Sequence, residues 1–592
     1  MSHDFDLSRE FGGKDRPSRR GPRDKPRSVH KVKRGADEQA VRPSQRRRAA
    51  LRKALRSPTT SHDEVALQSR HANAGDRSDD DLVKRLESAG NLFVITDEVL
   101  RALTSAPTLA RGLAVARSGD LRALDAAVAE PAVAQEFARP LATAALREMI
   151  LPSLTLEAVL TRLRRQFLQV CVNPGPLPSA KVNFEAVLNI ALQCWLNEFV
   201  WEETAEESLW VDIQESNVQS ALLTNPGNAE TGLAVLACYR PLYRLPRIAD
   251  LALSRLPQRG GLSELIRVTI VEPRREADIS KGFPRLESPA DAISRAVKQQ
   301  YEENPYPRWT RPLRHEPVTA QQHWQVVLPR DMARMAPVAE PLNILIAGCG
   351  TGHQVAAVAS RLPNSNIHAI DLSSASLAYA KRKAEELALH NVTFELADIL
   401  DLGSRPEFQG RFDYVECFGV LHHMANPAAG LQSLATCAKP GAVFYLGLYS
   451  RLGSGQVLAA QCAIADMGLQ RTAKDIRRLR KMIALNILGG ARLPFDPNGL
   501  EKFVDYYSTS MCRDLLFHVC EHFYDARAIK PLLDQAGLEF ACFELPAGLA
   551  KERYFEEFPH DPRLADAEAF SVFEARRGGL GGIHRFYARK PS

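Results

Sequence analysis

The residue types that could perform chemistry gather in one stretch of this sequence, residues 348–352, which contain three glycines. They directly follow the mostly apolar run 343–347, and two acidic residues, Asp371 and Asp398, come later in the chain. Glycine lets a backbone turn sharply and approach a ligand closely. A carboxylate at the end of a strand can accept hydrogen bonds from both hydroxyls of a ribose. The combination predicts a site for a nucleoside-like ligand.

The spacing of the glycines disfavours two kinds of phosphate-rich ligand. A dinucleotide-binding loop needs the pattern G-x-G-x-x-G, and the place of its third glycine is taken here by His353. A phosphate-cradling loop needs G-x-x-x-x-G-K-[ST], and neither Lys-Ser nor Lys-Thr follows these glycines. The loop is therefore poorly suited to a ligand that carries several phosphates.

An alternation of strands and helices must position these residues. Apolar, strand-like runs alternate with helical patterns from residue 343 onward, which predicts a parallel sheet with right-handed crossovers. The expected strands are 343–347, 366–371, 392–398, 412–418 and 442–449, closed by the pair 538–545 and 583–590. Ligands of such sheets bind at the carboxyl ends of the strands, and the glycines and both acids fall there.

An all-helical region is expected ahead of the sheet, over residues 85–291. In 156–170 and 184–199 the apolar residues recur at the i, i+3, i+4 and i+7 spacing of one helix face. Thr155 and Asn183 stand where the N-caps of these two helices are expected. No convincing period of about 34 residues is found, so a helical-repeat array is not predicted.

The N-terminal residues 1–80 differ from the rest in composition. Residues 1–56 contain 18 Lys and Arg against 7 Asp and Glu, and aromatic side chains are nearly absent after Phe11. Such a segment cannot bury enough apolar surface to offset the entropy of ordering it, which predicts a disordered basic tail. A solvated tail without a specific partner is favoured over a nucleic-acid tether, because no aromatic residues are interleaved for base stacking.

The overall composition predicts a cytoplasmic protein without a membrane partner. Hydrophobic residues make up 45% of the chain and charged residues 25%, as is usual for globular proteins. The ten cysteines include no CxxC pair, which favours reduced thiols. No apolar run approaches the roughly 18 residues that a membrane helix needs, and the N-terminus lacks the apolar segment of a secretory signal. The sequence does not indicate an oligomeric state.

These motifs resemble those of the class I S-adenosylmethionine (SAM) dependent methyltransferases. The resemblance runs from residue 344 to 449, through ILIAGCGTG, IHAIDLS, ELADIL, FDYVECFGVLHHMANP and KPGAVFYLGLY. Further segments, among them VKQQYEENPYPRW and YSTSMCRDLLFHVCEHFYD, are similar to a bacterial group of methyltransferase-domain proteins often described with tetratricopeptide repeats upstream. That wider similarity covers most of 150–590, and the basic tail replaces the repeats.

The resemblance implies an α/β Rossmann-like methyltransferase domain with a mostly parallel, seven-stranded sheet and with SAM as its cofactor. It implies that the glycines let the backbone approach the methionine part of SAM, that Asp371 holds the ribose and that Asp398 holds the adenine. Gln354 would meet the ligand's carboxylate, and Cys417 and Phe418 would lie beside the sulfonium methyl. The cofactor-binding residues expected in full are Ala347, Gly348, Cys349, Gly350, Gly352, Gln354, Asp371, Leu372, Asp398, Ile399, Cys417, Phe418, Tyr301, Tyr306 and Arg308.

Three segments could meet the methyl acceptor. His422 or His423 could act as a general base, although a packing or capping role is favoured for either one. Residues 301–309, YEENPYPRW, fit equally well as a lid over SAM or as an interdomain linker with aromatic anchors. Residues 513–525, RDLLFHVCEHFYD, are expected to form a wall of the acceptor pocket.

Within that last segment, Glu521 and His522 are the candidate catalytic residues. His518 and His522 are four residues apart, as in a helical zinc pair, but the order H-E-x-x-H is missing and no third ligand is evident. No metal site is therefore expected.

The sequence thus predicts a SAM-dependent methyltransferase, EC class 2.1.1, acting on a small-molecule or protein acceptor. The domain assignment is a basic tail over 1–80, a helical domain over 85–291, and a methyltransferase domain over 292–592 with a helical insertion at about 451–530. Two alternatives remain: a nucleic-acid (RNA) methyltransferase tethered by the basic tail, and a non-catalytic SAM-binding adaptor whose helical domain binds a partner. They differ in salt dependence and in whether any methyl group is transferred.

Overall fold

The computed structural model describes residues 79–592 apart from 89–95, 174–181, 258, 285–290, 313–314, 488–492, 494, 498 and 547–550. The tail predicted over 1–80 lies outside the described residues except for 79 and 80, which begin the first described helix. Residues 69–592 form one compact unit. None of the helices in the described ranges combines the length and the apolar character that a membrane crossing requires.

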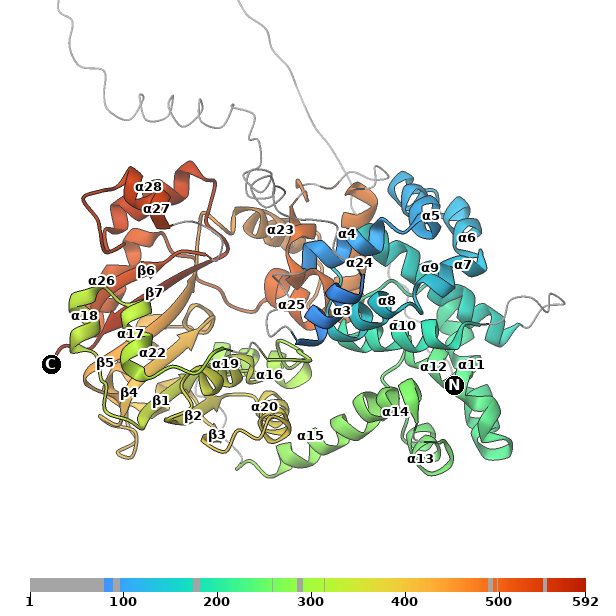
Figure 1. Ribbon diagram of the computed structural model, residues 1–592, viewed down its shortest axis with the longest axis horizontal. Helices are drawn as coiled ribbons and strands as arrows, with labels where there is room; N and C mark the ends of the chain where they lie inside the picture. Colours follow the sequence, from blue (N-terminus) through green and yellow to red (C-terminus); the bar gives the residue numbers. More distant parts are fainter. Residues whose placement is uncertain are drawn as a thin grey trace, which may run out of the picture. The chain divides into compact units, whose positions relative to one another are not determined.

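Seven strands form one sheet in the order β3-β2-β1-β4-β5-β7-β6 (Figure 1). Strands β1 to β5 pair in parallel, and β7 runs antiparallel to both β5 and β6. The strands are β1 Leu342–Ala347, β2 Ser365–Asp371, β3 Val392–Leu396, β4 Phe412–Phe418, β5 Ala438–Tyr449, β6 Glu539–Glu544 and β7 Ile583–Arg589. The predicted Rossmann-like, mostly parallel sheet is confirmed, and β5 begins four residues earlier than expected.

The helices between the strands explain where a ligand can bind. The chain moves from β1 outward to β2 and β3 in one direction and from β4 to β5 in the other, so right-handed crossovers place their connecting helices on opposite faces of the sheet. The strand order reverses between β1 and β4, and the crevice outside such a reversal is where open α/β sheets bind ligands. The connecting helices are α19 His353–Arg361, α20 Ser374–Glu386, α21 Ile399–Leu402 and α22 Pro427–Cys437.

A helical region precedes the sheet, as predicted. The buried stripe of α9 and the almost wholly buried α10 supply much of its apolar core. Asn183 is the N-cap of α10, because its Oδ1 accepts the Ala186 N–H at 3.1 Å. The cap expected at Thr155 is wrong: α9 begins earlier, and Ser153 Oγ accepts the Leu156 N–H at 3.3 Å.

The helices of this region follow one another closely along the chain. They are α3 Asp79–Ser88, α4 Thr96–Thr104, α5 Pro107–Ser118, α6 Leu121–Val128, α7 Pro131–Glu136, α8 Pro140–Glu148, α9 Leu154–Val172, α10 Phe184–Leu196, α11 Ala205–Thr224, α12 Glu230–Ala237, α13 Pro246–Arg255, α14 Gly260–Ile266 and α15 Glu272–Lys281. Two short helices and one longer one lead into the sheet, namely α16 Ala292–Glu303, α17 Ala320–Val327 and α18 Arg330–Met335. Beyond the insertion described next, the chain adds α26 Ile529–Gln535, α27 Lys551–Glu557 and α28 Ala567–Arg576.

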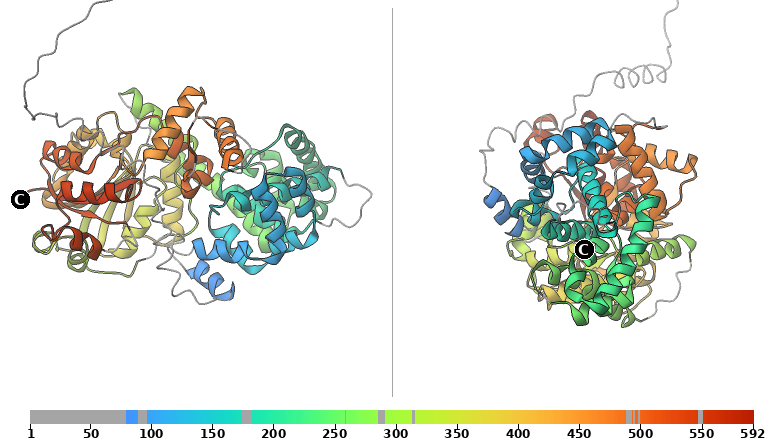
Figure 2. Two further views of the ribbon diagram at one scale, coloured as in Figure 1. Left: turned by 90° about the horizontal axis from the view of Figure 1, so that it is seen from above. Right: turned by 90° about the vertical axis from the view of Figure 1, so that its right-hand side faces the viewer.

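The helical insertion after β5 packs into the core of the N-terminal helical region. It contains α23 Gly455–Asp466, α24 Ala473–Ile487 and α25 Thr509–Phe517. Apolar side chains from all three helices join the hydrophobic cluster that also holds the cores of α9 and α10. The ribbons of these helices lie beside the helical region in Figures 1 and 2. The nearly buried Arg480 of α24 forms an ion pair with Glu157 of α9 at 2.8 Å. The insertion therefore ties the sheet to the helices that precede it.

Candidate functional site

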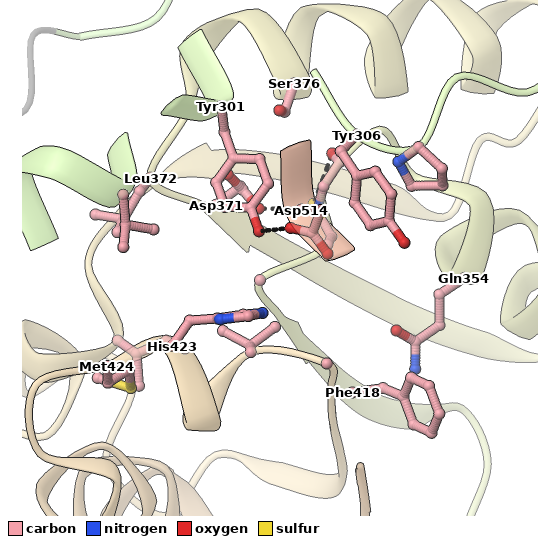
Figure 3. Close-up of a pocket in the computed structure, with 18 of the residues that line it drawn as sticks. Tyr301, Tyr306, Gln354, Asp371, Leu372, Ser376, Phe418, His423, Met424 and Asp514 are labelled. Carbon is pink, nitrogen blue, oxygen red and sulfur yellow. Dashed lines mark hydrogen bonds between the residues drawn. The ribbon is translucent and has the colours of Figure 1, made fainter. Parts of the chain in front are cut away.

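A cavity of about 300 Å³ lies at the carboxyl ends of β1, β2 and β3, next to the reversal of strand order. Three parts of the chain line it: the loops of the sheet, the segment that begins with α16, and the insertion. The lining residues that the site description below uses are Tyr301, Tyr306, Gly348, Gly350, Gln354, Asp371, Asp398, Phe418, His423, Tyr449 and Asp514. The cavity thus contains residues from both ends of the predicted methyltransferase domain (Figure 3).

The glycine loop has a backbone that other residues would not tolerate. Gly350 has φ of 51°, and a Cβ there would lie 2.7 Å from the backbone carbonyl oxygen of Tyr306. Gly352, the N-cap of α19 with φ of 82°, lies against Ala380 of α20, whose Cβ would be 2.7 Å from an added Cβ. Gly350 therefore serves the cavity, whereas Gly352 serves the packing of two helices and does not line it.

Asp371 and Asp398 both face the cavity and are held by nearby backbone. Asp371 accepts the Gly350 N–H at 2.8 Å with Oδ2 and the Ser373 N–H at 2.9 Å with Oδ1. Burial raises the pKa of Asp371 to about 6, although both hydrogen bonds oppose the rise. Asp398 caps α21 by accepting the Leu400 N–H at 3.0 Å, and burial raises its pKa as well. Each carboxylate has lone pairs left that can accept hydroxyl or amino hydrogens from a ligand.

The segment after α16 lies directly on the glycine loop. The Thr351 N–H donates to the Tyr306 carbonyl oxygen at 3.3 Å, and Trp309 Nε1–H donates to the Thr351 carbonyl oxygen at 3.1 Å. Arg311, a few residues on, donates two hydrogen bonds to Glu148 of the helical region, at 2.8 and 2.9 Å. Residues 301–309 thus pack over the loop as a lid would, and the residues that follow anchor the segment to the helical region.

Tyrosines surround a second buried carboxylate that lines the cavity, Asp514. Asp514 accepts the Tyr301 hydroxyl at 2.6 Å and the Tyr449 hydroxyl at 3.4 Å (Figure 3). Tyr306, from the lid, donates to Asp505 at 3.2 Å. Burial raises the pKa of each of these two aspartates to about 6, and no Lys or Arg among the described residues contributes to either shift. Neither carboxyl group has a Lys or Arg partner among the described residues.

His423 projects into the same cavity, whereas His422 does not (Figure 3). His423 Nδ1 lies 3.0 Å from the Cys520 carbonyl oxygen, and its ring stacks on that of His518 with centroids 3.7 Å apart. Burial lowers the pKa of His423 to about 4, so the ring is neutral near pH 7. His422 is fully buried and stacks on Tyr449 with centroids 3.8 Å apart.

Glu521 and His522 lie behind the cavity wall instead of lining it. Glu521 Oε2 accepts the Gln461 side-chain amide at 2.5 Å, and burial raises the pKa of this carboxyl to about 8. His522 Nε2 lies 3.0 Å from the Met424 carbonyl oxygen. Both side chains are held by protein partners in this structure.

Some of the predicted cofactor-binding residues fall outside the cavity for clear physical reasons. Cys417 is fully buried in the core of the sheet, because it points to the opposite side of β4 from Phe418. Arg308 lies 3.8 Å from Glu198 and stacks on Trp195, so its charge is engaged with the helical region. Of the predicted site residues, the ones that do not line the cavity are Ala347, Gly352, Cys417, Arg308, His422, Glu521 and His522.

The other predicted residues do line the cavity, and one of them is already engaged. Gln354 faces the cavity while its amide group donates to Glu416 of β4, a carboxylate that also pairs with Arg361 at 3.3 Å. The predicted residues that line the cavity are Tyr301, Tyr306, Gly348, Cys349, Gly350, Gln354, Asp371, Leu372, Asp398, Ile399, Phe418 and His423.

Sequence reasoning missed Asp514 and Tyr449 as individual site residues. Tyr449 is the last residue of β5, so the rule that placed Asp371 at the carboxyl edge of the sheet could have found it. Asp514 lies within the segment predicted to form the acceptor wall, but nothing in its spacing distinguishes it from its neighbours.

Comparison with known proteins places a methyltransferase domain in this part of the chain. Residues 340–486 match the family model described as a methyltransferase domain. An uncharacterised Synechococcus protein is 27% identical over 262 residues, which cover 43% of this chain and 60% of that protein. A ubiquinone biosynthesis O-methyltransferase from Albidiferax ferrireducens is 31% identical over 148 residues, covering 24% of this chain and 57% of its own. The chain thus spans about half of the length of the curated relatives that it matches.

Among solved structures, PKMT2 from Rickettsia typhi in complex with AdoHcy aligns with 48% of this chain and 54% of its own, at 18% identity and a TM-score of 0.32. Together, the matching family model, the glycine motif and the sheet order show that the α/β part of this chain is a class I methyltransferase domain.

Proposed function

We propose that this protein transfers a methyl group from SAM, bound in the cavity, to a small-molecule or protein acceptor. One observation carries the proposal. The glycine turn, Asp371 and Asp398, called here the glycine end, line the same cavity as Tyr301 and Asp514, called here the acceptor end. A nucleoside cofactor and a second molecule would therefore meet within a single enclosed space.

The residues at the glycine end fit the parts of SAM. The backbone at Gly350 leaves no room for a Cβ, as expected where a loop turns tightly under a ligand and a lid. In this proposal Asp371 accepts the ribose hydroxyls and Asp398 accepts the adenine amino group, which is supported by the presence of both side chains in the cavity lining. When bound, SAM supplies an electrophilic methyl group on a cationic sulfur, so the protein's task is alignment and exclusion of water.

The residues at the other end are suited to positioning an acceptor and handling its proton. Asp514, held by two tyrosine hydroxyls, and the neutral imidazole of His423 both face the cavity. If Nδ1 of His423 donates to the Cys520 carbonyl, its Nε2 carries a lone pair that can accept a proton. We propose that the methyl acceptor is a nucleophilic group. It either becomes nucleophilic when it loses a proton or already has a free lone pair.

Two alternatives are separated by their own tests. A nucleic-acid methyltransferase held by the basic tail predicts binding that weakens steeply with salt and that disappears when residues 1–80 are removed. An adaptor that binds SAM without catalysis predicts cofactor binding but no methyl transfer. The second alternative is less favoured, because a buried carboxyl with a raised pKa, Asp514, and a buried imidazole, His423, line the same cavity.

The proposal is tested by incubating the full chain with methyl-labelled SAM and a fractionated native extract. Transfer of label to a protein or metabolite fraction, reduced in the Asp371→Asn variant at SAM concentrations below saturation, supports it. Label that enters only RNA supports the tethered alternative. Calorimetry that shows no SAM binding by a folded protein would reject the proposal.

A further inference from the structure

A set of metal-ligating side chains lies against the acceptor end of the cavity. His423, His518 and Glu521 each offer one nitrogen or oxygen atom, and these three atoms lie within 4.8 Å of one another. The residues come from two parts of the chain, since His423 precedes α22 whereas the other two follow α25. Two imidazoles and one carboxylate form a ligand set found in both zinc and non-haem iron sites.

The two imidazole rings are oriented by a shared backbone acceptor. His423 Nδ1 lies 3.0 Å and His518 Nδ1 lies 2.7 Å from the carbonyl oxygen of Cys520. The Cys520 amide N–H donates to His518 Nδ1 at 3.1 Å, and His518 Nε2 lies 3.3 Å from the Tyr301 hydroxyl. An ion at His518 Nε2 would displace that hydroxyl and would require the tautomer whose Nδ1–H donates to the Cys520 carbonyl oxygen, as histidine ligands of metals commonly do.

Glu521 contributes a carboxylate that lacks a positive partner. Its Oε1 is buried without a hydrogen bond among the described residues, and its Oε2 receives only the neutral amide of Gln461. Asp514 adds a second buried carboxylate, with an oxygen 4.0 Å from His518 Nε2. No described Lys or Arg forms an ion pair with either acid. A cation bound at this position would take the place of the proton on the Glu521 carboxyl and provide the positive partner that this carboxylate lacks.

We propose that His423, His518 and Glu521 bind a divalent transition-metal ion, with Zn²⁺ as the first choice. If the three atoms formed an equilateral triangle at the 4.8 Å limit, its centre would lie about 2.8 Å from each. Side-chain shifts of under about 1 Å would then reach the 2.0–2.2 Å typical of zinc ligands. With three protein ligands, the ion keeps an open position, as catalytic zinc does.

The open position would face the acceptor, because His423 itself lines the cavity. An ion there would lower the pKa of an acceptor hydroxyl or thiol, whose proton leaves to solvent. This role rests on the proposed methyl transfer, but the binding of the ion does not. The two can therefore fail separately.

The test is metal binding by the full chain in the absence of SAM. The protein is stripped with a chelator, titrated with Co²⁺ while its visible absorption is followed, and titrated with Zn²⁺ by calorimetry. We expect one ion per chain, with affinity at least about 100-fold weaker in His518→Ala and in the isosteric Glu521→Gln variant. His390→Ala, which removes an exposed histidine elsewhere, should bind like the wild type.

Two outcomes would overturn the proposal. One is a wild-type protein that binds neither ion more tightly than Glu521→Gln does. The other is a chelator-treated protein that shows no metal-induced spectrum and still methylates an acceptor carrying an ammonium group at the full rate. The acidic side chains would then bind the positive charge of the acceptor and not a metal ion. Circular dichroism of each variant shows whether it is folded, and Glu521→Gln carries the test if His518→Ala is not.

Discussion

The two ends of the cavity are built in different ways. At the glycine end, Asp371 and Asp398 are fixed by backbone N–H groups that lie close by in the sequence or on the adjoining loop. At the acceptor end, Asp514 is fixed by tyrosine hydroxyls from α16 and β5, more than sixty residues away. The glycine end is thus a property of the three consecutive strands β1 to β3 and their loops, whereas the acceptor end exists only when the insertion is in place.

The helical region holds that insertion in place. The Thr509 N–H donates to the Asn197 carbonyl oxygen at 3.2 Å, and the Ser510 N–H donates to the Glu198 carboxylate at 2.6 Å. Both contacts fix the first turn of α25, the helix that carries Asp514. A helical region ahead of a methyltransferase domain therefore acts here as a support for the acceptor wall.

The largest effect is expected from Gly350→Ala at the glycine end. The added Cβ would meet the backbone of Tyr306, which cannot move without the lid, so SAM affinity should fall at least about 100-fold. Calorimetric titration with SAM measures this affinity. Gly410→Ala is the matched control, because Gly410 also has positive φ, of 57°, but has no atom within 4 Å of an added Cβ. If both variants bind SAM alike, the close approach of lid and loop is unimportant.

Asp514→Asn should separate the two ends. The substitution keeps the size of the side chain but removes its charge, so turnover should fall about 100-fold while SAM affinity stays within about threefold of the wild type. Single-turnover kinetics with labelled SAM, beside a calorimetric titration, measure both quantities. If SAM affinity falls as much as turnover does, Asp514 takes part in binding SAM. The distinction between the glycine end and the acceptor end would then be wrong.

Asp371→Asn should show the converse pattern with a smaller effect. One charged acceptor for the ribose is replaced by a neutral amide, which should weaken SAM binding about 10- to 30-fold. Turnover at saturating SAM should change little. A fall in turnover without any change in SAM affinity would contradict the role given to this residue.

The smallest effect concerns pH and the stability of the ligand-free protein. Burial raises the pKa of Asp371 to about 6, above the ordinary value of about 3.9, so the native state holds more protons than the unfolded state between these values. The free energy of unfolding should therefore fall as pH rises through this window.

In the Asp371→Asn variant this fall in the free energy of unfolding should be smaller by about 1 kcal/mol. The difference is no larger because solvent that enters the cavity screens the carboxylate. Urea unfolding of both proteins at about pH 4.5 and 7.5 gives the difference, provided that the m-values agree. Equal pH dependence in the two proteins would show that Asp371 is ionised normally in the absence of ligand.

Much of the local structure of both regions could be predicted from local sequence. The strand 412–418, the acid at the end of β2 and the cap at Asn183 agree with the structure, because each depends on residues adjacent in the chain. Side-chain direction was harder to predict. Cys417 and Phe418 are neighbours on one strand, and pleating sends only one of them to the cavity.

The sequence by itself determined the class of fold and the nucleoside-shaped end of the cavity, because glycine conformation, strand alternation and a strand-terminal carboxylate are local properties. Tertiary structure alone decided which side chains form the acceptor end. It brought His423 beside His518 and Glu521, and it supplied the third potential metal ligand that spacing within one helix could not reveal. The physical reason is that these contacts depend on how the insertion packs against the helical region, and that packing spans more than three hundred residues of chain, from Glu157 to Arg480.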